Sequence, residues 1–223
     1  MSIDVDEVEG CLCDAPAVVL ASGSPRRKEI LSGLGLDFEI ILPCGTVEPE
    51  FARGCCYSSS QIEKRVKDSA KSKVKCVVDI LERESVRGES LIIGADTVVV
   101  SRGKVLGKPA DAEEAKVMLR SLSGHWHRVF TGLSVAQLRK RRIVASCSVT
   151  AVHFRHLQDE EIERYVSTGH PLDKAGAYGI QELGSLFVSE IRGCYSNVVG
   201  LPIIVLDSLM KRLGWNILEM QKC

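Results

Sequence analysis

The stretch that decides the fold of this chain is VVLASGSPRRKEIL, from Val18 to Leu31. Its first three residues are apolar and are typical of the end of a buried strand. Small residues follow, and Pro25 favours the first position of a helix because its φ is already close to −65°. Ser24 then stands where a helix N-cap is expected. The stretch therefore predicts a strand, a tight turn and a helix in direct succession.

The same turn has the properties of an anion-binding site. Free backbone N–H groups and the positive end of the helix dipole meet at such a turn. Arg26 and Arg27 add two permanent charges whose forked donors suit phosphate oxygens. The residues also fit an ordinary capped helix with arginines on its solvated side, so this stretch alone leaves both interpretations open.

The bulk composition limits the classes of protein to which the chain can belong. Its 223 residues suffice for one large domain, or for two lobes that share a sheet. Basic and acidic side chains number 29 each, so no overall positive field attracts nucleic acid. No apolar run approaches the roughly 20 residues that span a bilayer. We expect a soluble, cytoplasmic protein that binds neither nucleic acid nor membrane.

Nine cysteines are scattered along the chain and form no CxxC pair. An odd count without the spacing of metal ligands favours reduced thiols and argues against structural zinc. Residues 1–16 are rich in acidic side chains and end at Pro16. We expect them to be a poorly ordered N-terminal extension, followed by a single domain of residues 17–223.

Strand and helix patterns alternate along the rest of the chain, with hairpins between them. Helices are expected at 61–83, 111–122, 159–167 and 202–213, and strands at 38–42, 91–93, 98–100, 128–138, 143–157 and 186–191. This order predicts an α/β fold with a mixed sheet. The basic run at 139–142 is interpreted as a solvated hairpin tip rather than a nucleic-acid site.

Two charged residues stand out between the predicted strands. Asp96 interrupts an apolar run, where an ionised carboxylate is costly unless it is paired, hydrogen-bonded or bound to a metal. It is a catalytic candidate, although a carboxylate that merely caps a loop or pairs with an arginine fits equally well. Lys108 precedes a proline that favours extended backbone, so it could reach the same cleft or simply lie on the surface.

A third cluster, DKAGAYGIQ, spans residues 173–181. Its glycines and alanines would allow a ligand to approach the backbone closely. Lys174 could bind a phosphate, and Gln181 could both donate and accept hydrogen bonds at the edge of a base. A glycine-rich structural turn is the alternative. None of these clusters matches a general phosphate motif, so spacing alone does not identify the ligand.

Taken together, several motifs resemble the Maf family of nucleoside triphosphate pyrophosphatases from about Val18 to near Leu213. They are ASGSPRRKEIL, GADTVVV, GKVLGKP, LSGHWHRVFTG, PLDKAGAYGIQ and NVVGLPI. The resemblance implies a mixed twisted sheet with flanking helices, in two lobes around a central cleft, as in Maf and ITPase-like proteins. It also implies a homodimer and a house-cleaning hydrolysis of a nucleoside triphosphate to its monophosphate and pyrophosphate, with Mg²⁺ or Mn²⁺.

Within that family, the DKAGAYGIQ version is similar to the branch that acts on dTTP and UTP, with modified pyrimidine nucleotides as further candidates. The resemblance implies catalytic roles for Asp96 and Lys108, and a metal site at Asp96 with Glu48 or Glu50. The residues expected to bind substrate are Ser22, Arg26, Arg27, Thr97, Lys174 and Gln181.

The chain departs from the family pattern at one position. The family places a lysine in a Lys-Ala pair within the helix after the long loop, and this chain has Ser69 before Ala70. A serine supplies no positive charge, so we expect Lys67 or Lys71 to substitute. A nucleotide-binding regulator of cell division with little turnover is the alternative function, but the retention of Asp96 and Lys108 argues against it.

Overall fold

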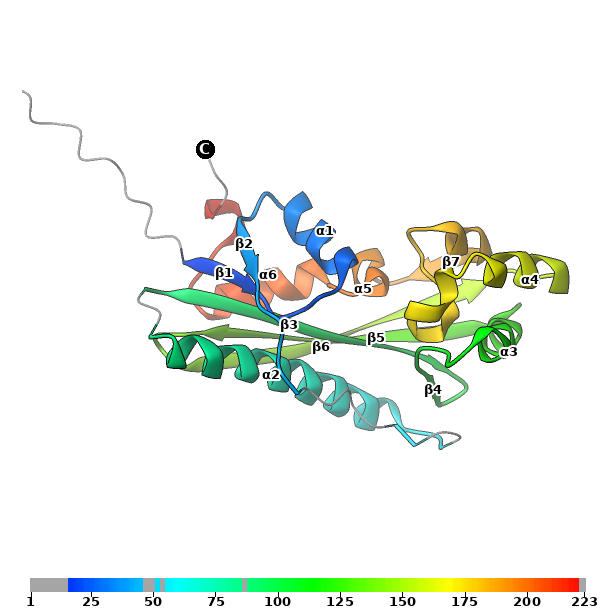
Figure 1. Cartoon of the computed structure of the whole chain (residues 1–223), viewed down its shortest axis with the longest axis horizontal. Helices are drawn as coiled ribbons and strands as arrows, with labels where there is room; N and C mark the ends of the chain where they lie inside the picture. Colours follow the sequence, from blue (N-terminus) through cyan, green and yellow to red (C-terminus); the bar gives the residue numbers. More distant parts are fainter. Residues whose placement is uncertain (1–15, 46–50, 53–54, 86–87, 221–223) are drawn as a thin grey trace, which may run out of the picture.

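The computed structural model describes residues 16–45, 51–52, 55–85 and 88–220. These residues form a seven-stranded sheet in the order β2-β1-β3-β5-β6-β7, with β4 paired to β3 (Figure 1). The strands are β1 (Ala17–Leu20), β2 (Phe38–Ile40), β3 (Ser90–Ser101), β4 (Lys104–Leu106), β5 (Trp126–Gln137), β6 (Arg142–Phe154) and β7 (Val188–Arg192). Because β1 runs parallel to β2 and β3 while the other pairs are antiparallel, the predicted mixed sheet is confirmed.

Six α-helices and four short 3₁₀ helices occupy the described part of the chain. The α-helices are α1 (Pro25–Gly33), α2 (Ser59–Arg83), α3 (Ala112–Leu122), α4 (Asp159–Ser167), α5 (Tyr195–Val199) and α6 (Ile203–Arg212). The 3₁₀ helices are η1 (His170–Asp173), η2 (Ala175–Ala177), η3 (Leu183–Phe187) and η4 (Ile217–Glu219). The sequence patterns located α1, α2, α3, α4 and α6 but missed α5 and the 3₁₀ turns, which are too short to show a helical period.

Strand β3 continues through Asp96, the residue that interrupts its apolar run. It pairs with β5 without interruption from Leu91, opposite Gln137, to Val100, opposite Arg128. The two apolar segments expected at 91–93 and 98–100 are therefore one strand. Asp96 lies near its middle, opposite Gly132.

The helices divide between the two faces of the sheet. Helix α2 covers one face, and α1 and α6 cover the other (Figure 1). At one end of the sheet, side chains of β1, α1 and α6 share an apolar core, and at the other end α3, α4 and β7 surround a second core. This arrangement gives the two lobes that the resemblance implied.

Helix α2 begins two residues before the predicted start because Ser58 caps it. The Ser58 hydroxyl accepts a hydrogen bond from the Gln61 amide, and the Gln61 side chain accepts one from the Ser58 amide. This reciprocal capping box satisfies two N–H groups that would otherwise lack partners. The helix then buries an apolar stripe that includes Val66, Ala70 and Val74 against β3 and β5.

Two glycines set the distance between α2 and the sheet. A Cβ at Gly132 of β5 would lie 2.2 Å from the Val66 carbonyl oxygen, and a Cβ at Gly94 of β3 would lie 2.6 Å from a Val74 methyl carbon. Neither distance is compatible with a side chain, so the helix lies directly on the strand backbones. This crossing lies beside Asp96.

A buried histidine supports the second lobe. His127 of β5 is 2% exposed, and its Nε2 lies 2.8 Å from the Tyr178 hydroxyl. Burial lowers the pKa of His127 from 6.5 to about 4, although a backbone hydrogen bond with His125 acts in the opposite direction. The imidazole is therefore neutral at neutral pH.

Some expectations fall outside the described residues. The expected N-terminal extension lies outside them except for Pro16. Glu48 and Glu50 also lie outside the described residues. Among the helices that the structure describes, none is long and apolar enough to span a membrane.

The close approach of α2 predicts that Gly132→Ala destabilises the fold. The new Cβ would overlap the helix backbone at Val66, and overpacking of this kind typically costs about 1–3 kcal/mol. Urea unfolding of the variant and the wild type measures the loss. Gly33→Ala is the control, because a Cβ at Gly33 meets nothing within 4 Å. Equal midpoints for Gly132→Ala and wild type would refute the packing argument.

The burial of His127 predicts a pH dependence of stability. The unfolded chain protonates this residue below about pH 6.5, whereas the folded chain does so near pH 4. Stability therefore falls as the pH drops from 6.5 towards 4, by up to about 3 kcal/mol from this group. His127→Gln should lose less stability than wild type between pH 7 and pH 4.5, measured by urea unfolding. The exposed residue His156 provides the control as His156→Gln, and identical losses in all three proteins would contradict the assignment.

Candidate active site

A cleft of about 440 Å³ lies where the turn after β1 meets β3, the segment after β4, η1–η2 and the end of α5. It brings together most of the charged and polar residues singled out in the sequence. Those that line it are Ser22, Arg26, Arg27, Thr97, Asp96, Lys108 and Lys174. The three clusters, which lie far apart in the sequence, therefore share one site.

The Asp96 carboxylate is held by a lysine that the sequence analysis overlooked. Lys73 of α2 places its Nζ 2.5 Å from Asp96 Oδ1 and 3.4 Å from the Ala95 carbonyl oxygen. Both side chains are largely buried, with exposed fractions of 12% for Lys73 and 8% for Asp96. A buried carboxylate needs such a counter-charge. The contact with Lys73 holds Oδ1, and Asp96 itself lines the cleft.

The expectation that Lys67 or Lys71 replaces the family lysine is wrong for this cleft. Lys71 is exposed and pairs with Asp68 at 3.7 Å, and Lys67 does not line the cleft. Lys73 lies one helical turn after Ser69 and therefore shares its side of α2. The sequence does contain a signal for Lys73, because this lysine is spaced in register with the buried positions of an amphipathic helix.

Arg27 is fixed by hydrogen bonds to three separate segments. Its Nε donates to the Gly200 carbonyl oxygen at 2.9 Å, and its Nη1 donates to the Ser22 hydroxyl at 2.9 Å. Nη2 lies 3.2 Å from the Thr97 hydroxyl, which in turn lies 3.0 Å from the hydroxyl of Thr131. These bonds orient a permanent positive charge at the cleft before any ligand arrives.

The turn before α1 differs in detail from its prediction. Ser24 takes the N-cap position with extended backbone, but its side chain makes no capping hydrogen bond. Its amide instead lies 3.3 Å from the hydroxyl of Ser22. The hydroxyl of Ser22, which is 7% exposed, therefore accepts hydrogen bonds both from the Ser24 amide in this turn and from Arg27.

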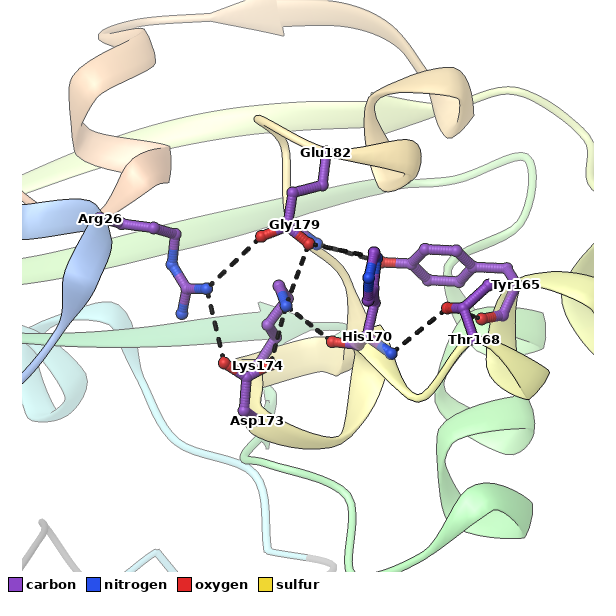
Figure 2. Close-up of polar contacts among 8 residues, drawn as sticks. All are labelled: Arg26, Tyr165, Thr168, His170, Asp173, Lys174, Gly179 and Glu182. Atoms are coloured by element: carbon purple, nitrogen blue, oxygen red, sulfur yellow. Dashed lines mark hydrogen bonds and ion pairs between the residues drawn. The ribbon is translucent and has the colours of Figure 1, made fainter. Parts of the chain in front are cut away.

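Arg26 and Lys174 form ion pairs with two carboxylates, those of Asp173 and Glu182 (Figure 2). Arg26 Nη1 lies 3.7 Å from Asp173 Oδ2 and 4.0 Å from Glu182 Oε1. Lys174 Nζ lies 2.7 Å from Asp173 Oδ1 and 3.2 Å from Glu182 Oε2, and donates to the His170 carbonyl oxygen at 2.7 Å. Two cations and two anions thus neutralise one another at this wall.

The charges of this group act on Asp173. Partial burial alone would raise the pKa of the Asp173 carboxyl. The hydrogen bond from Lys174, together with the positive charges of Lys174 and Arg26, outweighs burial and brings that pKa below its ordinary value of 3.8. Asp173 is therefore ionised at neutral pH and holds the two cations in place.

Two residues of the predicted site lie at its edge or beyond it. Lys108 is exposed and lines the cleft from the segment after β4. Gln181 is exposed and does not line the cleft, whereas its neighbours Gly179 and Ile180 do. A base-reading role for Gln181 remains a prediction. The left-handed backbone at Gly176 and Ala177 bends the strip just before these residues.

Comparisons with known proteins show which proteins this chain resembles. The chain is 44% identical over 201 residues to the dTTP/UTP pyrophosphatase of Dictyoglomus thermophilum, covering 90% of this chain and 98% of that protein. It is 42% identical over 202 residues to the dTTP/UTP pyrophosphatase of Caldicellulosiruptor bescii, covering 91% and 97%. The corresponding protein of Thermoanaerobacter pseudethanolicus is 45% identical over 195 residues, covering 87% and 95%.

A solved structure, that of the Staphylococcus aureus Ham1 protein, matches with a TM-score of 0.35 and 11% identity over 62% of this chain and 71% of that chain. The family model described as Maf-like protein matches residues 17–213, a span that includes every residue placed in the cleft. The chain therefore belongs to the Maf family.

Proposed function

We propose that this chain is a nucleoside triphosphate pyrophosphatase that hydrolyses dTTP and UTP to their monophosphates and pyrophosphate. The observation that carries the proposal is that the Asp96 carboxylate and five cationic side chains line one cleft. These cations are Arg26, Arg27, Lys73, Lys108 and Lys174. Relatives named dTTP/UTP pyrophosphatase, which are 42–45% identical to nearly the full chain, support this choice of substrates.

The cations suit a triphosphate, which carries about four negative charges. A cation about 4 Å from a phosphate charge gains roughly 4 kcal/mol at an effective dielectric constant of 20, before desolvation is counted. Arg27 is already oriented by its three hydrogen bonds, so it loses little freedom when a phosphate binds. Arg26 would exchange its carboxylate partners for phosphate oxygens.

Asp96 is the proposed general base. Lys73 holds Oδ1, so Oδ2 is the atom that would accept a proton from the attacking water. Fixing one oxygen of the carboxylate orients the other, and the lysine charge compensates the burial of the ionised form. Lys108 would stabilise the negative charge that develops on the phosphoryl oxygens.

The donor set of the cleft fits a divalent cation that is shared with the substrate. Mg²⁺ is usually held by one or two carboxylates together with phosphate oxygens and waters, and Asp96 supplies one carboxylate. Among the residues that the structure describes, no group of three His, Cys, Asp or Glu side chains could form an all-protein cage. We therefore propose Asp96 as a ligand of Mg²⁺ or Mn²⁺, with Glu48 or Glu50 as a further ligand. A bound cation would neutralise charge on the phosphoryl oxygens.

Product analysis tests the proposed reaction. The protein is incubated with Mg²⁺ and a panel of ribo- and deoxyribonucleoside triphosphates, and the products are separated by chromatography. We expect TMP or UMP together with pyrophosphate from dTTP and UTP, and slower turnover of purine nucleotides. Release of inorganic phosphate with a diphosphate would indicate a different hydrolase. Binding without turnover would favour the nucleotide-binding regulator instead.

The role of Asp96 predicts that Asp96→Asn loses turnover while it retains the fold. The amide keeps the shape of the carboxylate but accepts no proton, and the loss of a general base typically costs 10²- to 10⁴-fold in rate. Pyrophosphate release from dTTP measures the loss, and circular dichroism checks the fold. Asp68→Asn, which removes an exposed carboxylate of α2, is the control and should keep wild-type activity. Near-normal turnover in Asp96→Asn would exclude Asp96 as the base.

A further inference from the structure

Two cysteines from distant parts of the sequence touch each other beside the cleft. Cys44 follows β2, and Cys76 lies on α2, 32 positions later. The Cys76 Sγ lies 3.1 Å from the Cys44 amide nitrogen and 3.3 Å from the Cys44 carbonyl oxygen. We propose that these two residues are a thiol modification site, which a small-molecule disulfide converts into an intramolecular Cys44–Cys76 disulfide.

The backbone geometry brings the two residues within reach of each other. An amide nitrogen lies about 1.46 Å from its own Cα, so the Cys76 Sγ lies within roughly 4.6 Å of the Cys44 Cα. That sulfur is only two bonds from the Cα of Cys76, so the pair is near the spacing of about 4.4–6.8 Å between Cα atoms that a disulfide spans. The Cys44–Cys76 bond therefore requires the Cys44 side chain to turn toward a sulfur that already contacts its own backbone.

The surroundings of the pair favour reaction. Cys44 is exposed and Cys76 is half-buried. Both line a surface hollow together with Lys75, Asp79 and Arg83, so a small-molecule disulfide can reach the pair from solvent.

Another cysteine provides the contrast within the same chain. Burial raises the pKa of the Cys147 thiol to about 12. The negative charge of Glu63 adds to this rise, and the positive charge of Lys67 opposes it. At neutral pH this thiol is therefore protonated, and a protonated thiol is a poor nucleophile. The chain therefore contains its own unreactive reference.

The reaction is a two-step thiol–disulfide exchange with a reagent such as oxidised glutathione. The more exposed Cys44 loses its proton and attacks one sulfur of the reagent, which forms a mixed disulfide and releases one molecule of thiol. Cys76 then loses its proton and attacks the Cys44 sulfur, which forms the Cys44–Cys76 bond and releases the second thiol. The two protein thiols are oxidised by two electrons, and the reagent is reduced to two thiols.

The position of the pair gives the bond a structural consequence. Pro43, the residue before Cys44, lines the cleft, and Lys73 lies three residues before Cys76. The disulfide would fix this wall of the cleft to the helix that delivers Lys73 to Asp96. This proposal does not depend on the proposed function, because formation of the Cys44–Cys76 disulfide is measured without any enzymatic turnover.

Peptide mapping by mass spectrometry tests the proposal. The full chain is reduced, freed of reductant, incubated with oxidised glutathione, alkylated and digested. We expect a cross-linked Cys44–Cys76 peptide in the wild type, lost again after treatment with dithiothreitol. Cys76→Ser should accumulate a glutathione adduct on Cys44, because no second thiol resolves it. Cys147→Ser is the matched control and should give the same cross-link as wild type.

Three results would overturn the proposal. One is a wild-type protein that carries glutathione adducts or free thiols at both positions without the cross-link. The second is a Cys44 that pairs with the neighbouring exposed Cys55 or Cys56 instead. The third is a Cys76→Ser variant that carries no adduct on Cys44, which would exclude Cys44 as the attacking thiol. Unchanged thermal unfolding of the reduced variants establishes that the substitutions leave the fold intact.

Discussion

The direct contact between the backbone of α2 and the strands β3 and β5 is the constraint on which this structure depends. It exists because Gly94 and Gly132 carry no side chain at the crossing. The contact brings Lys73 within 2.5 Å of Asp96, and so supplies the counter-charge that a carboxylate needs among apolar strands. A spacing wider by one side chain would leave Asp96 buried without compensation. The packing of the helix and the chemistry of the cleft therefore share a single cause.

Charge in the cleft is organised differently on its two sides. On the wall formed by η1 and η2, Asp173 and Glu182 neutralise Arg26 and Lys174. On the side of β1 and β3, three oxygens from separate segments orient the guanidinium of Arg27. The two sides of the cleft therefore hold their arginines differently, one by carboxylates and the other by hydroxyl and carbonyl oxygens.

Sequence reasoning located the residues whose signals are local and missed those that depend on tertiary distance. The SGSPRR turn, Asp96 and Lys108 stand out by their neighbours in the chain, and the structure brings them to one cleft. Lys73 lies on a helix and contacts Asp96 on the sheet, although the two residues are 23 positions apart in the sequence. No local sequence pattern specifies the distance between that helix and the sheet. Gln181 follows a bend at Gly176 and Ala177, where left-handed backbone redirects the strip in a way that residue types do not specify. Asp96 interrupts the apolar run of β3 but not its pairing, because ten consecutive pairs with β5 outweigh one polar residue.

The hydrogen bond from Arg27 to Gly200 joins residues 173 positions apart. A ribosome makes the chain from its N-terminus, so Arg27 emerges long before its carbonyl partner. The cleft is consequently completed only once the segment that carries Gly200 has been made. A nascent chain that stalls before Gly200 presents its arginine without the oxygen that orients it, and such a fragment does not possess the finished site.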